Sequence, residues 1–144
     1  MSTFHRSAMR RNKPSAPAKW VFENIGFDPD TTLDYGCGRG DDVDHFGIDG
    51  WDVNGTKWDL KNNKYTTILC SYVLNVIPSS WERGEVIRDI RGHLTEDGTA
   101  YITVRNDRDK LNGWTKLGTY QTFVDLKFPV VYKTSTYLIY EVKK

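Results

Sequence analysis

The chain has 144 residues, a formal net charge of +1, two cysteines and three histidines. This length suits one hydrophobic core, so we expect residues 1–144 to form a single domain. Its apolar runs all fall short of the roughly 18 residues of a membrane span, so we expect no membrane partner. Its cysteines and histidines lack the spacing of a disulfide framework or of metal ligands. We therefore expect a cytoplasmic protein with no metal site.

The first segment of the chain is basic. Residues 1–22 contain no acidic side chain, and we call residues 1–13 the basic arm. The cations of the first 22 residues are Arg6, Arg10, Arg11, Lys13 and Lys19. Two interpretations stay open: a solvated terminus, or a segment that contacts a phosphate or carboxylate of an acceptor, which can be a small molecule or a nucleic acid.

A short helix is predicted directly after the arm. Ser15 is a suitable N-cap, because its hydroxyl can accept a hydrogen bond from the first turn. We expect Trp20, Val21 and Ile25 to point inward and Gly26 to end the helix.

Strand and helix patterns then alternate. We expect a short strand at 31–36, a helical turn or two at 41–47, and a second short strand at 50–55. Residues 65–78 hold the most apolar run of the chain, as in a central strand that is buried on both faces.

The best helix prediction follows this run. Ser79 and Glu82 form a capping-box pattern, and residues 96–98 should stop the helix. Its apolar face consists of Val86, Ile87, Ile90 and Leu94. Residues 99–107 alternate as a strand should, with Ala100, Ile102 and Val104 on one face.

The last third of the chain changes character. Residues 119–126 and 135–144 are rich in β-formers, and no convincing helix separates them. They predict an antiparallel pair added to a mostly parallel sheet. Together with the alternation before them, they indicate an α/β sandwich, in which ligands bind at the carboxyl ends of the strands.

A glycine-rich loop, GCGRG, joins the strand at 31–36 to the helix at 41–47. Its spacing is G-x-G-x-G, whereas a dinucleotide loop requires G-x-G-x-x-G, and the chain contains no P-loop motif. Asp34 precedes the glycines, and Asp41 and Asp42 follow them. These acids oppose a pyrophosphate at the helix N-terminus and favour a cationic ligand.

The stretch LDYGCGRG resembles the first motif of Rossmann-like, class I S-adenosylmethionine-dependent methyltransferases. The similarity covers roughly residues 31–106 and is closest to small methyltransferases of bacteria and phages. It implies a Rossmann-like methyltransferase sandwich, S-adenosylmethionine as the cofactor, and methyl transfer to an unidentified acceptor. Two alternatives stay open, a non-catalytic module that binds S-adenosylmethionine and an enzyme that cleaves it.

The resemblance also implies a cofactor site. Asp34, Gly36 and Gly38 would lie at the methionine end of the cofactor. Asp52 would accept both ribose hydroxyls, since a carboxylate offers two acceptor oxygens. The full set of expected cofactor-binding residues is Asp34, Tyr35, Gly36, Cys37, Gly38, Gly40, Asp52, Asp59 and Ser71.

One departure from the family pattern affects the edge of the sheet. About a dozen residues separate Asp52 from Tyr65, too few for the family's usual third strand and its helix. We therefore expect a trimmed sheet, with Asp59 and Leu60 as substitute adenine contacts. The trimmed edge is also an expected place for a second copy of the chain to pair.

Methyl transfer needs proximity, orientation and sometimes a base, because the methyl group arrives already activated. The expected residues on the acceptor side are Ser71, Tyr72, Asn75 and Arg105. Tyr72 can equally fill the core, and Asn75 can equally cap a turn. Arg105 is a candidate for bidentate binding of an anionic substrate. The chain lacks the [DNS]-P-P-[YFW] and Pro-Cys signatures of DNA base methylation.

Overall fold

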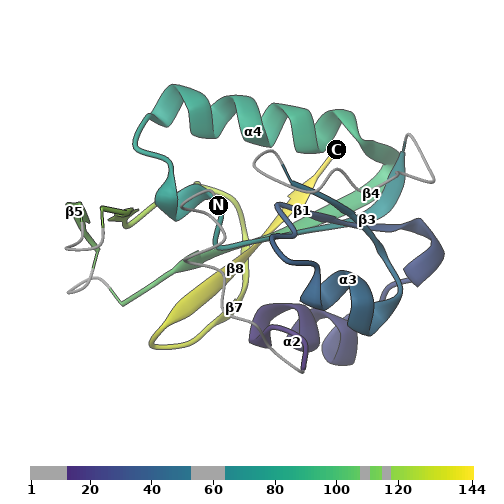
Figure 1. Cartoon of the computed structure of the whole chain (residues 1–144). Coiled ribbons are helices and arrows are strands. Elements are labelled where there is room, and N and C mark those ends of the chain that lie inside the picture. The colour runs from purple at the N-terminus through teal and green to yellow at the C-terminus, as the bar shows by residue number, and fades with distance from the viewer. Residues whose placement is uncertain (1–12, 53–63, 108–110, 115–117) are drawn as a thin grey trace.

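The computed structural model describes residues 13–52, 64–107, 111–114 and 118–144 (Figure 1). Its helices are α2 (Ala16–Asn24), α3 (Asp41–Phe46) and α4 (Ser80–Gly92), with short 3-10 helices η1 (Pro29–Thr31) and η2 (Leu74–Val76). Its strands are β1 (Thr32–Tyr35), β2 (Asp49–Trp51), β3 (Tyr65–Ser71), β4 (Leu94–Arg105), β5 (Asn112–Trp114), β6 (Tyr120–Thr122), β7 (Val130–Lys133) and β8 (Tyr137–Lys143).

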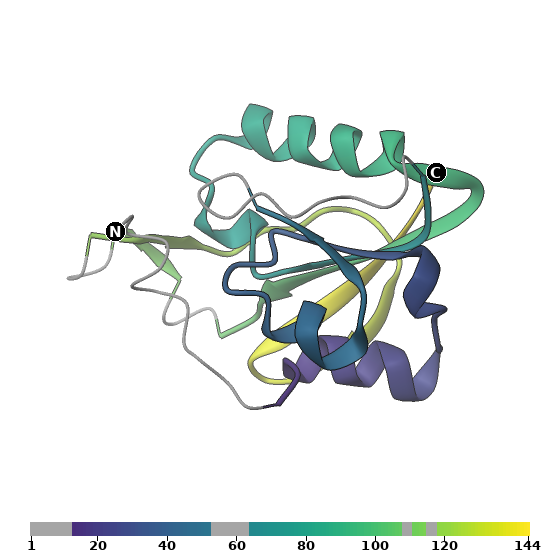
Figure 2. The same ribbon diagram turned by 45° about the vertical axis from the view of Figure 1, so that its right-hand side comes forward.

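Six of these strands form one sheet in the order β2-β1-β3-β4-β8-β7. The first four run parallel, and β8 and β7 are added antiparallel. In both views α4 covers one face of this sheet, while α2 and α3 cover the other (Figures 1 and 2). This confirms the predicted α/β sandwich. The trimming of the edge beyond β2 stays a prediction, because residues 53–63, where a further strand and its helix would lie, are outside the described residues.

The predicted antiparallel pair was wrong in one member. Strand β8 pairs with β7, whereas residues 120–122 pair with β5 in a separate two-stranded sheet. A tight connection explains the choice of β7, because the Thr134 hydroxyl accepts hydrogen bonds from the amides of Thr136 (3.1 Å) and Tyr137 (3.0 Å). A short hairpin closes at less entropic cost than a pairing across the longer intervening segment.

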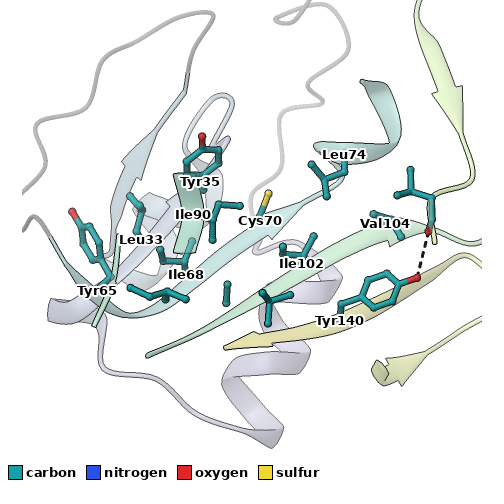
Figure 3. Close-up of a cluster of buried hydrophobic side chains, with 14 of the residues drawn as sticks. Leu33, Tyr35, Tyr65, Ile68, Cys70, Leu74, Ile90, Ile102, Val104 and Tyr140 are labelled. Atoms are coloured by element: carbon teal, nitrogen blue, oxygen red, sulfur yellow. Dashed lines mark hydrogen bonds between the residues drawn. The ribbon is translucent and has the colours of Figure 1, made fainter. Parts of the chain in front are cut away.

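The core beneath α4 is built as the alternation predicted. Ala100, Ile102 and Val104 lie on one face of β4 and are fully buried with Ile90 of α4 (Figure 3). Ser79 caps α4 as expected, since its hydroxyl accepts a hydrogen bond from the Glu82 amide at 3.3 Å.

The predicted end of α4 was too late. The helix stops at Gly92, and residues 96–98, expected to stop it, lie inside β4. Leu94 is already paired with Tyr65 of β3, and the Tyr65 amide donates to the carbonyl of His93 at 2.7 Å. Pairing with β3 therefore takes over as soon as the helix ends.

The opposite face carries the shorter helices. Val21 of α2 is buried as predicted, and the half-buried Trp20 stacks on Tyr132 with ring centroids 4.4 Å apart. Ile25 was predicted to point inward but is 43% exposed. The reason is its position, because Ile25 is the C-cap residue at which the chain leaves the helix.

Ser15 fixes the start of α2 twice over. Its hydroxyl accepts a hydrogen bond from the Ala18 amide at 3.4 Å, which is the predicted cap. Its amide and hydroxyl also donate to the two carboxylate oxygens of Asp42 in α3, both at 2.7 Å. The first described helix is thereby tied to the helix that follows the glycine loop.

Because Ser15 has this double role, its loss should lower the free energy of unfolding more than the loss of Ser79, which caps α4 alone. Ser15→Ala should lower the free energy of unfolding by about 2–3 kcal/mol, because it removes a cap and a bond to a carboxylate. Ser79→Ala removes a cap alone and should cost about 1 kcal/mol. Thermal unfolding should show a drop of roughly 6–10 °C for the first variant and about a third of that for the second. Equal losses would contradict the link to Asp42.

Candidate functional site

The glycine loop lies at the carboxyl end of β1, and its backbone path requires glycine. Gly36, Gly38 and Gly40 have φ values of +82°, +58° and +84°, which residues with a side chain rarely adopt. A Cβ on Gly36 would also lie 2.5 Å from Cγ2 of Val73, just beyond the end of β3. The loop therefore passes directly against the segment that follows the neighbouring strand.

Hydrogen bonds fix the loop to the end of β2. The amides of Gly36 and Cys37 both donate to the carbonyl of Trp51, at 2.7 and 3.0 Å. The amide of Gly38 donates to Oδ2 of Asp52 at 2.9 Å. The structure thus brings Asp52 to the glycine loop, as the cofactor-site prediction requires.

Asp52 also has a role that the sequence did not predict. It is nearly buried, and one of its carboxylate oxygens holds the loop in place. A carboxylate offers about four lone-pair sites, so one hydrogen bond does not by itself use up its capacity as an acceptor. Asp52 is therefore both a support for the loop and a candidate ligand-binding group.

Asp34 is the most unusual charged group of the site. It is 4% exposed, and none of the described residues donates a hydrogen bond to its carboxylate. Burial raises the pKa of Asp34 well above its usual value, and the negative charges of Asp42 and Asp52 raise it further. A positively charged ligand beside Asp34 would favour its ionised form and oppose this rise in its pKa.

Alternation along β1 separates two residues that the sequence had placed together. Asp34 lies near Asp42 of α3, whereas Tyr35 points under α4, where its hydroxyl donates to Oδ2 of Asp89 at 2.7 Å (Figure 3). The Tyr35 ring also packs on Trp51, with centroids 4.9 Å apart. The side chain of Tyr35, predicted to bind cofactor, is therefore a core contact.

The remaining predicted cofactor residues are placed as follows. Cys37 is buried in the core beside α3 and Gly50, so only its backbone belongs to the loop. Ser71 ends β3 and is half-buried. Asp59 lies outside the described residues, as do Arg6, Arg10 and Arg11 of the arm. Lys13 is exposed, and Lys19 pairs with Glu23 at 3.9 Å.

The acceptor side begins where β3 ends. Tyr72 has a φ of +64°, which is uncommon for a bulky residue, and its amide donates to the carbonyl of Thr103 at 2.9 Å. Asn75 follows in η2 and is 1% exposed. Its Nδ2 donates to Oε1 of Gln121 in β6 at 2.8 Å. Sequence reasoning could not find Gln121, because no motif marks a contact over this separation.

Arg105 reaches the same edge at the end of β4. Its Nε donates to Oδ1 of Asp107 at 2.9 Å, and its Nη2 donates to Oδ2 of the same carboxylate. The guanidinium fork that was expected to bind an anionic substrate is thus already engaged by a neighbour. Anion binding by Arg105 stays a prediction, and it would require this ion pair to open.

The sequence predicted neither a metal site nor a membrane-spanning helix. Among the described residues, no group of three or more His, Cys, Asp or Glu side chains could hold a metal ion. Within the same ranges, no helix is long and apolar enough to cross a membrane.

The raised pKa of Asp34 gives a stability prediction with a defined sign. The unfolded carboxyl titrates near its usual pKa of about 3.9, so ionisation penalises the folded state increasingly as pH rises above that value. Asp34→Asn should therefore unfold at a higher temperature than the wild type at pH 7.5, with the difference shrinking towards pH 4. Asp44→Asn, on the exposed side of α3, is the control and should show no such gain. A lower unfolding temperature of Asp34→Asn at both pH values would contradict the assignment.

Comparisons with known proteins give a family and two similar folds. Residues 6–132 match a protein family described as a methyltransferase domain. The fold is similar to that of the PH0226 protein from Pyrococcus horikoshii OT3, with a TM-score of 0.61 and 9% identity over 86% of this chain and 85% of that one. It is also similar to the DhpI–SAH complex structure, with a TM-score of 0.55 and 10% identity over 76% of this chain and 74% of the other.

At these identities the solved structures show the likeness of fold, while the family match rests on the sequence itself. A search of curated proteins found no match. The matched residues span well over half of the chain and include the glycine loop, Asp52 and the ends of β3 and β4. The chain therefore belongs to the methyltransferase-domain family.

Proposed function

We propose that the protein transfers a methyl group from S-adenosylmethionine to a separate acceptor. Family membership supports methyl transfer. The observation that carries the choice of cofactor is Asp34, a buried acid with two further acids nearby and no donor among the described residues. S-adenosylmethionine brings an ammonium and a sulfonium to such a site, whereas a phosphate-containing cofactor would bring more negative charge.

The residues present fit the cofactor in chemical character. Asp34 would balance the positive charge of its methionine end, and the side-chain-free backbone of Gly36 and Gly38 would allow close approach. Asp52, whose Oδ2 accepts from the Gly38 amide, would accept the ribose hydroxyls through its carboxylate oxygens.

The bound cofactor supplies a methyl group that is already activated by the sulfonium. The work of the protein is then to position an acceptor against this methyl group. Tyr72, Asn75 and Ser71 stand at the carboxyl end of β3, next to the strand that carries the loop. They are the proposed lining of the acceptor side.

Product analysis separates this proposal from its two alternatives. The wild-type protein should convert S-adenosylmethionine to S-adenosylhomocysteine only when an acceptor is present, and the label of a methyl-tritiated cofactor should appear in that acceptor. Consumption of the cofactor without any acceptor would instead identify a cleaving enzyme. Tight binding without product, against nucleic acids, proteins and small molecules alike, would identify a binding module.

Asp52→Asn is the sharpest test of the cofactor position. The asparagine oxygen can still accept from Gly38, so the loop should persist, but a donor replaces the second acceptor oxygen and the negative charge is lost. Affinity for S-adenosylmethionine, measured by isothermal titration, should fall at least tenfold, because hydrogen bonds to charged groups are worth about 1.5–3 kcal/mol. The unfolding temperature without cofactor should change by only a few degrees.

Asp52→Ala is the matched comparison, because it also leaves the Gly38 amide without its partner. It should lose both affinity and several degrees of unfolding temperature. Wild-type affinity in a folded Asp52→Asn variant would show that the ribose binds elsewhere.

A further inference from the structure

An unpaired acceptor is buried on the acceptor side of the site. Among the described residues, Oδ1 of Asn75 is the one side-chain nitrogen or oxygen atom that is completely inaccessible to solvent and has no hydrogen-bond partner. The residue is 1% exposed, so solvent does not satisfy this oxygen. A buried polar atom without a partner is costly and rare, and it calls for a specific explanation such as a ligand that completes the site.

The orientation of this oxygen is fixed from the other side of the amide. Nδ2 of Asn75 donates to Oε1 of Gln121 at 2.8 Å. Gln121 is the middle residue of β6 and pairs with Gly113 of β5, so it is held by a hairpin that lies against η2. This hairpin lies beyond the carboxyl end of β4 (Figure 1). Gln121 therefore uses the donor end of the Asn75 amide and leaves its acceptor end for another group.

The chain segment around Asn75 connects the two halves of the site. Val73 lies against Gly36 of the glycine loop, so closely that a Cβ there would be 2.5 Å from its methyl group. Two residues later, Asn75 contacts the hairpin through Gln121. Tyr72, with its positive φ, makes the turn from β3 into this segment. The unpaired oxygen thus belongs to the short bridge between the proposed cofactor loop and the hairpin.

The chemistry of the neighbourhood defines the class of group that would bind. An amide oxygen is a neutral acceptor and forms hydrogen bonds with N–H or O–H donors. The charge of Arg105 is paired with Asp107, and the amide of Asn106 donates to the carbonyl of Thr134 at 2.8 Å. A thiolate, a carboxylate or a carbon nucleophile would bring no donor to the unpaired oxygen.

We propose that Oδ1 of Asn75 accepts a hydrogen bond from the nucleophile of the methyl acceptor, which is therefore an amine, an amide N–H or a hydroxyl group. Gln121 is the positioning residue that holds Asn75 in this orientation. The inference rests on the proposed function and adds the acceptor class to it. A lone pair of the nucleophile forms the bond to the methyl carbon, the carbon–sulfur bond breaks, and its electron pair remains on sulfur. The proton of the nucleophile passes to water, because an amide oxygen is too weak a base to keep it.

Two cofactor analogues test the inference without knowledge of the acceptor. In both, a nitrogen replaces the sulfonium sulfur; one carries a 2-hydroxyethyl group in place of the methyl, and the other carries a propyl group of similar size. The wild type should bind the hydroxyethyl analogue about tenfold more tightly, because its hydroxyl can donate to the unpaired oxygen. Equal affinity for the two analogues in the wild type would overturn the proposal.

Variants of Asn75 and Gln121 test whether these residues cause the preference for the hydroxyethyl analogue. In Asn75→Leu the preference for the hydroxyethyl analogue should disappear, and in Gln121→Leu it should weaken. Gln121→Glu keeps an oxygen that accepts from Nδ2 of Asn75, so this variant should retain the wild-type ratio. The same preference in Asn75→Leu as in the wild type would overturn the proposal.

The unfolding temperature of the ligand-free protein tests the role of Asn75 independently of analogue binding. Because Asn75→Leu removes an unpaired buried acceptor, its unfolding temperature should be no lower than that of the wild type. A drop of several degrees together with an unchanged analogue ratio would show a purely structural asparagine. Failure of the wild type to bind S-adenosylhomocysteine or either analogue would overturn the proposed function itself.

Discussion

Asp34 lies one residue before the end of β1 inside the fold, with Asp42 and Asp52 close enough to raise its pKa. Each of the two neighbours is held by its own contacts, Asp42 by Ser15 and Asp52 by the amide of Gly38. The two flanking acids therefore accept hydrogen bonds, whereas none of the described residues donates one to Asp34. Folding alone does not require such an arrangement, since an uncharged residue in place of Asp34 would avoid the electrostatic cost. This is the observation from which we propose a cationic ligand beside Asp34.

The two sides of the proposed site differ in charge. Around the glycine loop the buried charged side chains are the acids Asp34, Asp42 and Asp52, whereas Arg39 of the loop is exposed; the buried acids suit a cofactor that carries positive charge. At the ends of β3 and β4 the groups are amides, an aromatic ring and a neutralised ion pair. A neutral acceptor can approach such a surface without strong repulsion or attraction. The difference in charge suits two different roles. The loop side would bind the cofactor tightly, and the other side would orient the acceptor.

The sequence predicted those parts of the fold that local rules determine. The glycine loop was predictable because alternate glycines mark backbone that must take positive φ, and Ser15 and Ser79 were predictable as helix caps. The face of each strand residue also follows from alternation, yet the loop motif drew attention to Tyr35 as a neighbour of Asp34. The motif indicated the backbone path of the loop, whereas the Tyr35 side chain lies under α4, because adjacent strand residues point to opposite faces.

Other features depend on choices that no short motif records. The pairing of β8 with β7 was decided by a tight turn at Thr134, although residues 119–126 had an equally strand-like composition. The contact between Asn75 and Gln121 joins segments far apart in sequence, and it depends on where the small hairpin packs. The engagement of Arg105 by Asp107 requires a side-chain geometry that composition cannot give.

Isothermal titration of the wild-type protein with S-adenosylmethionine and with NAD tests the central claim most directly. The acidic loop should bind the cationic cofactor and show no measurable heat with the dinucleotide, whose pyrophosphate would face Asp34, Asp42 and Asp52. The preference for S-adenosylmethionine should weaken in Asp34→Asn, because this variant removes the charge that distinguishes the two ligands. Binding of NAD at similar or higher affinity, or no binding of S-adenosylmethionine at millimolar concentration, would contradict the assignment of the loop.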